Sequence, residues 1–299
     1  MWGGALSGKV DVFHAPDHFI PKLRDVPVVA TLHDAVPISH PHWTSPGLRS
    51  FKNWLWLRSS QWAQHIITIS EFSKAEIVRH FGIPSERISV VHNGVDERYF
   101  ERIDADQGDA AVAAMNLPER FFMFVGTFQP RKNIERIVDA HEALPPALRQ
   151  AVPLLIVGRN GWGSEALVAR LKAYPAGGPV RWLQNVDDLA KRVMMQRATA
   201  LVFPSLLEGF GLPVLEGFAS QTPVITSNQT SLPEVAGDAA WLVDPYDVRA
   251  LTEAMATLAR EPALCSTLVT KGLDRARQFS WAMCARRTVD VYEQVLSKS

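Results

Sequence analysis

Short runs of hydrophobic residues alternate along most of this chain with longer segments of helical periodicity. The runs are rich in Val, Ile and Phe, and they do not alternate apolar with polar positions. Strands that are buried on both faces have this pattern, which is typical of parallel sheets covered by helices. We predict strands at residues 10–14, 26–33, 65–70, 88–92, 121–126, 154–158, 180–183, 200–204, 223–226 and 239–243.

The segments between these runs predict helices. The helix after Ser70, a favourable N-cap residue, is expected to end at Gly82, because glycine commonly follows a helix and Pro84 comes just beyond. Further helices are predicted at residues 48–64, 134–143, 164–173, 188–198, 213–220, 248–260, 262–278 and 281–297.

The chain is expected to form two α/β domains. Residues 101–116 are polar, acidic and rich in alanine, without a strand pattern, and we interpret them as a linker. We place the first domain at residues 1–105 and the second at 106–299, with the helix at 281–297 crossing back to the first. The second part alternates strands and helices enough for a complete doubly wound sheet, whereas the first has only four predicted strands.

Composition and charge exclude several classes of protein. Hydrophobic residues make up 47% and charged residues 21% of 299 residues, as in well-cored soluble proteins. Lys and Arg number 31, as do Asp and Glu, so binding to nucleic acid through bulk positive charge is not expected. Cys265 and Cys284 are too isolated for a disulfide framework or zinc site. The hydrophobic runs are too short to span a membrane and no signal peptide is recognised, so we expect a cytoplasmic protein.

Two adjacent cations follow one predicted strand. Ligands of open α/β sheets bind at the carboxyl ends of the strands, and Arg131 and Lys132 come shortly after the run at 121–126. Together with the partial positive charge of a helix N-terminus, they could neutralise a diphosphate leaving group without a metal. The alternative is that both cations are solvated surface residues.

A second loop carries two acids and a helix start. After the run at 200–204, Gly211 and Leu212 precede Pro213, which suits the first position of a helix, so their backbone N–H groups are available to an anion. Glu208 lies before this helix and Glu216 within its predicted first turn. Acids on either side of such a turn suit sugar and ribose hydroxyls, although Glu216 could instead compensate the helix macrodipole.

The stretch from Glu208 to Glu216 resembles the Glu-x7-Glu motif of retaining glycosyltransferases of the GT-B fold, in family 4 (glycosyl transferases group 1). The resemblance spans nearly the whole chain. The Gly-Thr-x-x-Pro-Arg-Lys-Asn signature of residues 126–133 resembles a subgroup with bacterial mannosyltransferases. Further matching segments lie at residues 31–34, 67–73, 91–96, 155–158, 223–228 and 231–240.

The resemblance implies a fold of two Rossmann-like domains and a set of donor-binding residues. Arg131 and Lys132 would hold the diphosphate, and Glu208 would contact the hexose hydroxyls. Glu216 would contact the ribose. Further donor contacts are implied at Gly126, Thr127, Phe210, Gly211 and Leu212, and at the turn of Asn185 and Val186, whose backbone would meet the base.

Two further points come from the same resemblance. Many members carry Arg directly after the glycine at position 126, where this chain has Thr127, so Arg131 is the candidate to replace it. His33, at the end of the run at 26–33, resembles the family's histidine that faces the sugar and phosphate from the first domain. A histidine at a strand end is otherwise more often a structural residue.

The implied reaction moves a hexose from a nucleotide diphosphate sugar with retention of configuration, the leaving phosphate taking the acceptor's proton. Neither a metal nor another cofactor is needed. We expect mannose from GDP-mannose as the donor, and a saccharide or lipid-linked saccharide of cell-surface polysaccharide or lipopolysaccharide synthesis as the acceptor.

Family members usually carry a further N-terminal segment with a glycine-rich loop, so we expect a truncated first domain, with oligomerisation as one consequence. Two other functions stay open. The chain could be a non-catalytic nucleotide-binding remnant or a subunit that needs a partner, or it could have another GT-B activity, such as sugar-nucleotide epimerisation.

The segment at 51–62 is rich in aromatic residues. Helical spacing places Phe51, Trp54, Leu55 and Trp62 on one broad face, which we interpret as core. The alternative is a basic, aromatic surface in peripheral contact with the membrane that holds a lipid-linked acceptor.

Overall fold

The computed structural model describes residues 8–43 and 49–298 of the chain. By internal contacts the chain divides into two compact units. The first comprises Met1–Gly94 together with Trp281–Ser299, and the second comprises Val95–Ser280. Each unit is built around its own parallel sheet.

The sheet of the first unit has the strand order β1-β2-β3-β4, and every neighbouring pair is parallel. Helix α13 (Trp281–Leu296) places Val291 and Val295 against Val29 and Ile67 of one sheet face. The C-terminal helix therefore packs in the core of the N-terminal unit. The strands are β1 (Phe13–Ala15), β2 (Val28–Thr31), β3 (His65–Thr68) and β4 (Ile88–Val90), with helices α1 (Val36–Ser39), α2 (Arg49–Ser60) and α3 (Glu71–Phe81).

The sheet of the second unit has the order β10-β9-β8-β5-β6-β7, again with all pairs parallel. From β5 the chain builds outward through β6 and β7, and it then returns to place β8 on the other side of β5. The strand order thus reverses between β5 and β8, the point where open α/β sheets bind their ligands. The strands are β5 (Phe122–Val125), β6 (Leu154–Val157), β7 (Val180–Leu183), β8 (Ala200–Phe203), β9 (Val224–Ser227) and β10 (Trp241–Val243).

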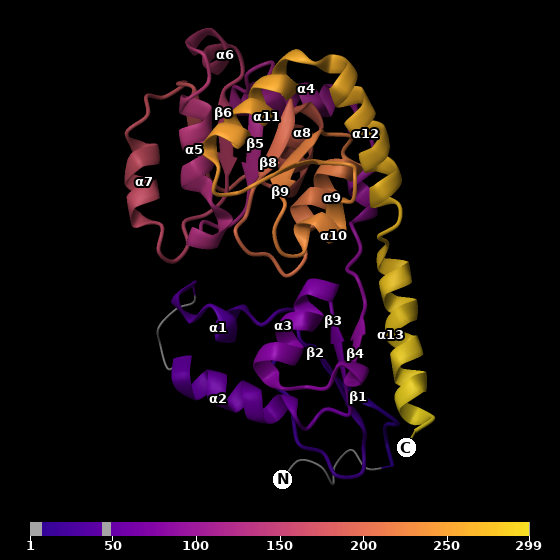
Figure 1. The fold of residues 1–299 in the computed structure, drawn as a ribbon. Coiled ribbons are helices and arrows are strands. Elements are labelled where there is room, and N and C mark those ends of the chain that lie inside the picture. Colours follow the sequence, from indigo (N-terminus) through magenta and orange to yellow (C-terminus); the bar gives the residue numbers. More distant parts are fainter. Residues whose placement is uncertain (1–7, 44–48, 299) are drawn as a thin grey trace. The chain divides into compact units, whose positions relative to one another are not determined.

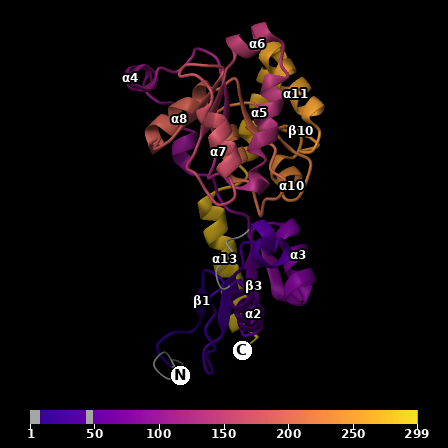
Figure 2. The same cartoon turned by 90° about the vertical axis from the view of Figure 1, so that its left-hand side faces the viewer.

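Helices cover both faces of this second sheet. Helix α5 packs against α11, and α9 packs against α12 and α8; Figures 1 and 2 show α5 and α7 on one side of the sheet and α12 on the other. The prediction of parallel sheets buried between helices is confirmed. The helices are α4 (Ala105–Met115), α5 (Ile134–Glu142), α6 (Pro146–Ala151), α7 (Glu165–Lys172), α8 (Asp188–Arg197), α9 (Leu212–Ala219), α10 (Leu232–Ala236), α11 (Val248–Arg260) and α12 (Pro262–Ala276).

The segment interpreted as a linker, residues 101–116, contains helix α4 instead. The carboxylate of Asp104 caps this helix by accepting hydrogen bonds from the N–H groups of Asp106 and Gln107. Alanine has the highest helix propensity of all residues. The alanine content of this segment therefore favoured a helix as strongly as its polar residues favoured a linker.

The core interpretation of helix α2 is wrong for two of its aromatic residues. Phe51 and Trp54 are 61% and 54% exposed, and their rings stack on each other with centroids 6.0 Å apart. Trp56, which helical spacing placed elsewhere, packs with Leu57 against the buried cluster under β2 and β3. The helix is therefore rotated relative to the predicted face, which leaves Phe51 and Trp54 outside the core of their unit.

Candidate functional site

The turn after β5 and the turn after β8 lie side by side at the switch point of the second sheet. The backbone N–H of Leu206 donates to the carbonyl oxygen of Arg131 across a distance of 2.8 Å. Parallel strands end at the same edge of a sheet, and β5 and β8 are direct neighbours. The two motifs that the sequence singled out therefore share one site.

Three charged side chains meet in this site. The carboxylate of Glu208 accepts a hydrogen bond from Lys132 Nζ at 2.6 Å and one from Arg131 Nη1 at 2.9 Å. Arg131 Nη1 also donates to the carbonyl oxygen of Leu207 at 2.9 Å. The two cations are therefore not freely solvated surface groups, and the alternative that we left open for them is wrong.

Burial and charge act in opposite directions on Glu208. The residue is only 7% exposed, and this burial by itself raises the pKa of the carboxyl group. The ammonium of Lys132 and the guanidinium of Arg131 outweigh that effect and hold the pKa of Glu208 below its ordinary value. The carboxylate is therefore ionised at neutral pH and serves as counter-ion to both cations.

Lys132 reaches this position over an aromatic surface. Its Nζ lies 4.7 Å from the ring centroid of Phe203, the last residue of β8. The negative face of an aromatic ring attracts a cation, so the ring and the carboxylate together fix where the positive charge lies.

Asn133 ties the two turns together, a role that the sequence did not predict. Its side-chain amide donates to the carbonyl oxygens of Pro204 at 2.9 Å and Pro245 at 2.7 Å. Its backbone is left-handed, with φ 61°, a conformation that asparagine tolerates better than most residues. In the sequence, the available signal for this role was an asparagine directly before a predicted helix.

Ser231 supports the acidic loop in a similar way and was also not predicted. Its buried hydroxyl lies 2.9 Å from the carbonyl oxygen of Glu208 and 2.7 Å from that of Phe210. A donor from the turn after β9 thus fixes the backbone on which Glu208 stands. Which carbonyl oxygens it would meet could not be read from the sequence.

Gly126 and Thr127 follow β5 at the same edge of the sheet. The N–H of Gly126 donates to the carbonyl oxygen of Val157 at 3.0 Å, and Thr127 is exposed. A Cβ atom added to Gly158 would lie 1.9 Å from the carbonyl oxygen of Gly126. The ends of β5 and β6 therefore approach so closely that only glycine fits at position 158.

The backbone at Phe210, Gly211 and Leu212 leads directly into α9. Gly211 is the N-cap and has φ 125°, while Leu212 is the first helical residue. Phe210 is buried and packs edge to face against Phe279, with ring centroids 5.9 Å apart. The positive φ of Gly211 favours glycine, and a Cβ atom there would also force the end of the Leu232 side chain, 2.8 Å away, to shift.

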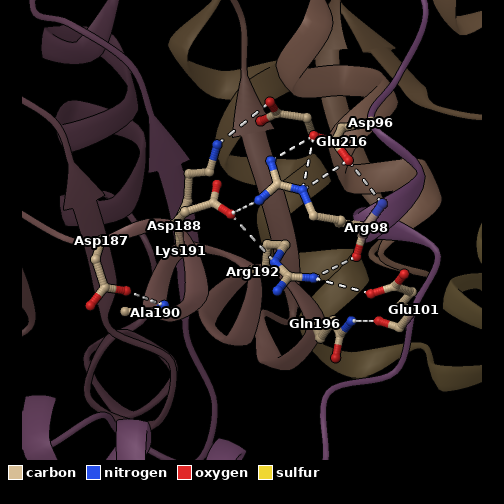
Figure 3. A network of polar contacts seen from close by, with 10 residues as sticks. All are labelled: Asp96, Arg98, Glu101, Asp187, Asp188, Ala190, Lys191, Arg192, Gln196 and Glu216. Atoms are coloured by element: carbon tan, nitrogen blue, oxygen red, sulfur yellow. Dashed lines mark hydrogen bonds and ion pairs between the residues drawn. The ribbon is translucent and has the colours of Figure 1, made fainter. Parts of the chain in front are cut away.

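Glu216 lies in the second turn of α9, and its predicted place in the first turn is wrong. Macrodipole effects fall off within the first turn, so compensation of the dipole does not explain this residue. Its carboxylate lies 3.6 Å from the ammonium of Lys191 on α8 (Figure 3). Burial raises the pKa of Glu216, although Lys191 and Tyr99 oppose that shift.

Asn185 and Val186 form the turn after β7, at the same sheet edge but away from the ion cluster. Strand β6 lies between β5 and β7, so this turn is two strands from Arg131. Asn185 is exposed and has a left-handed backbone with φ 55°. The structure thus places Asn185 and Val186 at the edge of the predicted site.

His33 belongs to the first compact unit, where it follows β2 and is exposed. The neighbouring Asp34 accepts a hydrogen bond at 3.0 Å from the N–H of Val36, the first residue of α1. The role expected for His33 therefore stays a prediction.

Within residues 8–43 and 49–298, no group of three or more His, Cys, Asp or Glu side chains could hold a metal ion. None of the helices in this described part is long and apolar enough to cross a bilayer.

Comparison with known families gives two matches that together cover most of the chain. Residues 109–275 match the family described as glycosyl transferases group 1, and residues 3–99 match Glycosyltransferase Family 4. The first match alone covers more than half of the chain.

Individual proteins agree with these matches. The chain is 31% identical to the O-antigen chain mannosyltransferase B of Escherichia coli, over 94% of this chain and 74% of that protein. It is 29% identical to the serotype-specific mannosyltransferase WbdA of Escherichia coli, over 92% of this chain and 34% of that protein.

A solved structure supports the fold. HepE of Anabaena, crystallised with UDP-glucose, superposes with a TM-score of 0.75 at 18% identity, over 90% of this chain and 72% of that one. Two parallel sheets in Rossmann-like units, the N-terminal one smaller, are thus the GT-B fold.

Proposed function

This chain belongs to the group 1 glycosyl transferases, family 4 of the glycosyltransferases, and on that premise we propose that it transfers mannose from GDP-mannose to a saccharide or lipid-linked saccharide. The acceptor belongs to the synthesis of a cell-surface polysaccharide such as lipopolysaccharide. The O-antigen mannosyltransferase of Escherichia coli, 31% identical to this chain, supports the choice of sugar. In this proposal the second compact unit, Val95–Ser280, binds the donor, and the first unit binds the acceptor.

The cluster of Arg131, Lys132 and Glu208 is the observation that carries this proposal. The two cations suit a diphosphate, and the carboxylate bound to them suits the hydroxyls of a sugar. The cluster lies next to the start of α9 and therefore suits a ligand that combines both groups. The diphosphate takes over the cations, because it offers them more negative charge than one carboxylate. Glu208 then accepts hydrogen bonds from hexose hydroxyls.

The transfer step needs only groups that the donor and this cluster supply. The bond between the anomeric carbon and the phosphate oxygen breaks, and a bond from that carbon to the acceptor oxygen forms on the same face. The acceptor's proton passes to the leaving phosphate oxygen. Arg131 and Lys132 stabilise the negative charge that develops on this phosphate, which is typically the largest contribution to catalysis.

Other donor contacts follow the resemblance to the family. Glu216 binds the ribose hydroxyls, and the turn of Asn185 and Val186 meets the base. The backbone near Gly126 and Gly211 allows the phosphates to approach closely. A contribution of His33 is tested separately, by the effect of His33→Ala on the rate of transfer.

A transfer assay tests the proposal. Purified protein is incubated with GDP-mannose and a panel of acceptor saccharides, and released GDP and the product's anomeric configuration are measured. We expect GDP release that depends on an acceptor, an α-linked product, and loss of both in Glu208→Ala. Binding of GDP without transfer favours the non-catalytic remnant, and conversion of the free sugar nucleotide favours an epimerase.

Contact with a membrane is a second, separate proposal. Phe51 and Trp54 are exposed, and Arg58 lies 5.9 Å from the Trp54 ring centroid on the same helix. Aromatic and basic side chains together suit the interface of an anionic bilayer. Flotation with anionic vesicles checks this, because the protein should float with them, and Trp54→Ser should weaken the association.

A further inference from the structure

Lys191 occupies a defined position beside the proposed ribose ligand. Its Nζ lies 3.6 Å from Oε1 of Glu216, and the two side chains are only 23% and 20% exposed. Figure 3 shows the ammonium pointing from α8 toward the carboxylate on α9. A partly buried ion pair is screened less than a surface pair.

Tyr99 forms the surface on which Lys191 rests. The ring of Tyr99 is 3% exposed, and Lys191 Nζ lies 5.0 Å from its centroid. The helix that carries Lys191 is fixed at its start, because Asp187 accepts a hydrogen bond from the N–H of Ala190 at 2.7 Å. The ammonium is therefore held between a ring and a carboxylate rather than left to sample solvent.

The other charges around Glu216 are mostly paired with one another. Asp188, also on α8, accepts a hydrogen bond from Arg98 at 3.0 Å and lies 3.7 Å from Arg192 (Figure 3). Arg98 in turn bonds Asp96 at 2.7 Å. Because these charges largely neutralise one another, Lys191 is the cation that balances the negative charge of Glu216.

We propose that Lys191 is a positioning residue, held over Tyr99, that keeps the Glu216 carboxylate ionised and aimed so that it can bind the ribose of the donor nucleotide. This inference rests on the proposed function. It adds a role for two residues, Lys191 and Tyr99, that do not themselves touch the nucleotide.

The chemistry of ribose binding explains why the charge matters. An ionised carboxylate can accept hydrogen bonds from two adjacent hydroxyls, whereas a protonated one has lost part of that capacity. Burial raises the pKa of Glu216, Asp188 adds to the shift, and Lys191 and Tyr99 oppose it. Without the ammonium, the carboxyl group therefore takes up a proton at a higher pH.

Calorimetric titration of GDP at pH 6 and pH 8 tests the proposal with Lys191→Met. We expect Lys191→Met to weaken GDP binding more at pH 6 than at pH 8, by up to about 10-fold, since removing a nearby opposite charge shifts a pKa by about one unit. The ratio of variant to wild-type Kd should be smaller at pH 8, because a higher pH favours the ionised carboxylate in the variant. Lys191→Arg should restore the wild-type profile.

Two controls separate positioning from other effects. With 2′,3′-dideoxy-GDP, which lacks the ribose hydroxyls, Lys191→Met should bind like the wild type at both pH values. Arg197→Met removes a cation from the other end of the same helix, where Arg197 bonds Asp109, and should leave the profile unchanged. If Lys191→Met fails to fold by circular dichroism, Lys191→Gln replaces it, with the same pH pattern expected.

The outcomes distinguish this inference from the proposed function. A wild-type protein that binds neither GDP nor UDP overturns both. Wild-type binding combined with a Kd ratio that is equal at both pH values, or that persists with the dideoxy nucleotide, overturns only the role of Lys191. Such a result would mean that Lys191 contacts the phosphates directly or acts on the fold alone.

Discussion

The ammonium of Lys132 lies 2.6 Å from the carboxylate of Glu208, although 76 positions separate the two residues in the chain. The same carboxylate bonds Arg131 at 2.9 Å. The protein thus supplies its own anion at the place where we propose that a diphosphate binds. Glu208 and the diphosphate therefore compete for the same two cations.

This competition predicts that neutralising Glu208 strengthens the binding of a bare diphosphate. Glu208→Gln removes the resident negative charge but keeps the size of the side chain, so inorganic pyrophosphate should bind about 10-fold more tightly, corresponding to about 1.4 kcal/mol. Sugar transfer should be lost. Calorimetric titration with pyrophosphate measures the first effect and the GDP-release assay the second.

The matched control for this variant is Glu216→Gln, the same chemical change on α9. Pyrophosphate has no ribose, so its affinity for Glu216→Gln should equal that of the wild type. Equal affinities of the wild type and Glu208→Gln for pyrophosphate would show that the carboxylate and the anion do not share the cations.

The stability of the protein should depend on the ionisation of Glu208. The pKa of this group is lower in the folded than in the unfolded protein, so its contribution is complete above about pH 4.3, the unfolded value, and is lost as the pH falls through the folded pKa. At pH 7, Glu208→Gln should lower the free energy of unfolding by about 3 kcal/mol, because two cations lose a buried partner.

Urea unfolding of the wild type and Glu208→Gln between pH 7 and pH 3 measures this dependence. The difference between their free energies of unfolding should narrow below pH 4.3, as the wild-type carboxylate takes up a proton. A difference that stays constant across this range would mean that the ion cluster does not stabilise the fold.

Asn133 should be required for the geometry of the site. Asn133→Gly keeps the left-handed backbone accessible but removes both amide hydrogen bonds, which should cost about 1–3 kcal/mol of stability. The KM for the donor should rise, because Arg131 and Lys132 directly precede this residue. Asn116→Gly, at another left-handed position with φ 47°, is the control and should change neither quantity. An unchanged KM in Asn133→Gly would contradict the role in positioning.

The central strands, such as β6, β8 and β9, were predictable because they are buried on both faces and therefore read as uninterrupted apolar runs. Residues 121–126 and 200–204 predicted β5 and β8, and ligand binding at strand ends predicted the importance of the turns that follow. The family resemblance then implied which residues would act on the donor. Helix α9 was predicted as well. It begins at Leu212, one residue before the predicted start, so Glu216 lies in its second turn.

The contacts of Asn133, Ser231 and Lys191 could not be predicted in the same way. Each depends on which strands and helices become neighbours, since Asn133 bonds a carbonyl after β8 and Lys191 meets a carboxylate on the next helix. The exposed side of α2 was missed for a related reason. Helical spacing shows which residues share a face, but not which face a neighbouring sheet will cover.

Nucleotide titration of wild-type protein and of the double variant Arg131→Ala/Lys132→Met tests the central claim most directly. GDP is compared with GMP, and UDP with UMP, because each pair differs only in the second phosphate. Arg170→Met, which removes a cation that bonds Asp139 at 2.6 Å instead of a residue of the site, serves as the control. We predict that the wild type and Arg170→Met prefer the diphosphate by about 100-fold, or about 2.7 kcal/mol, and that the double variant loses this preference. A double variant that folds and still prefers the diphosphate to the same degree would contradict the account.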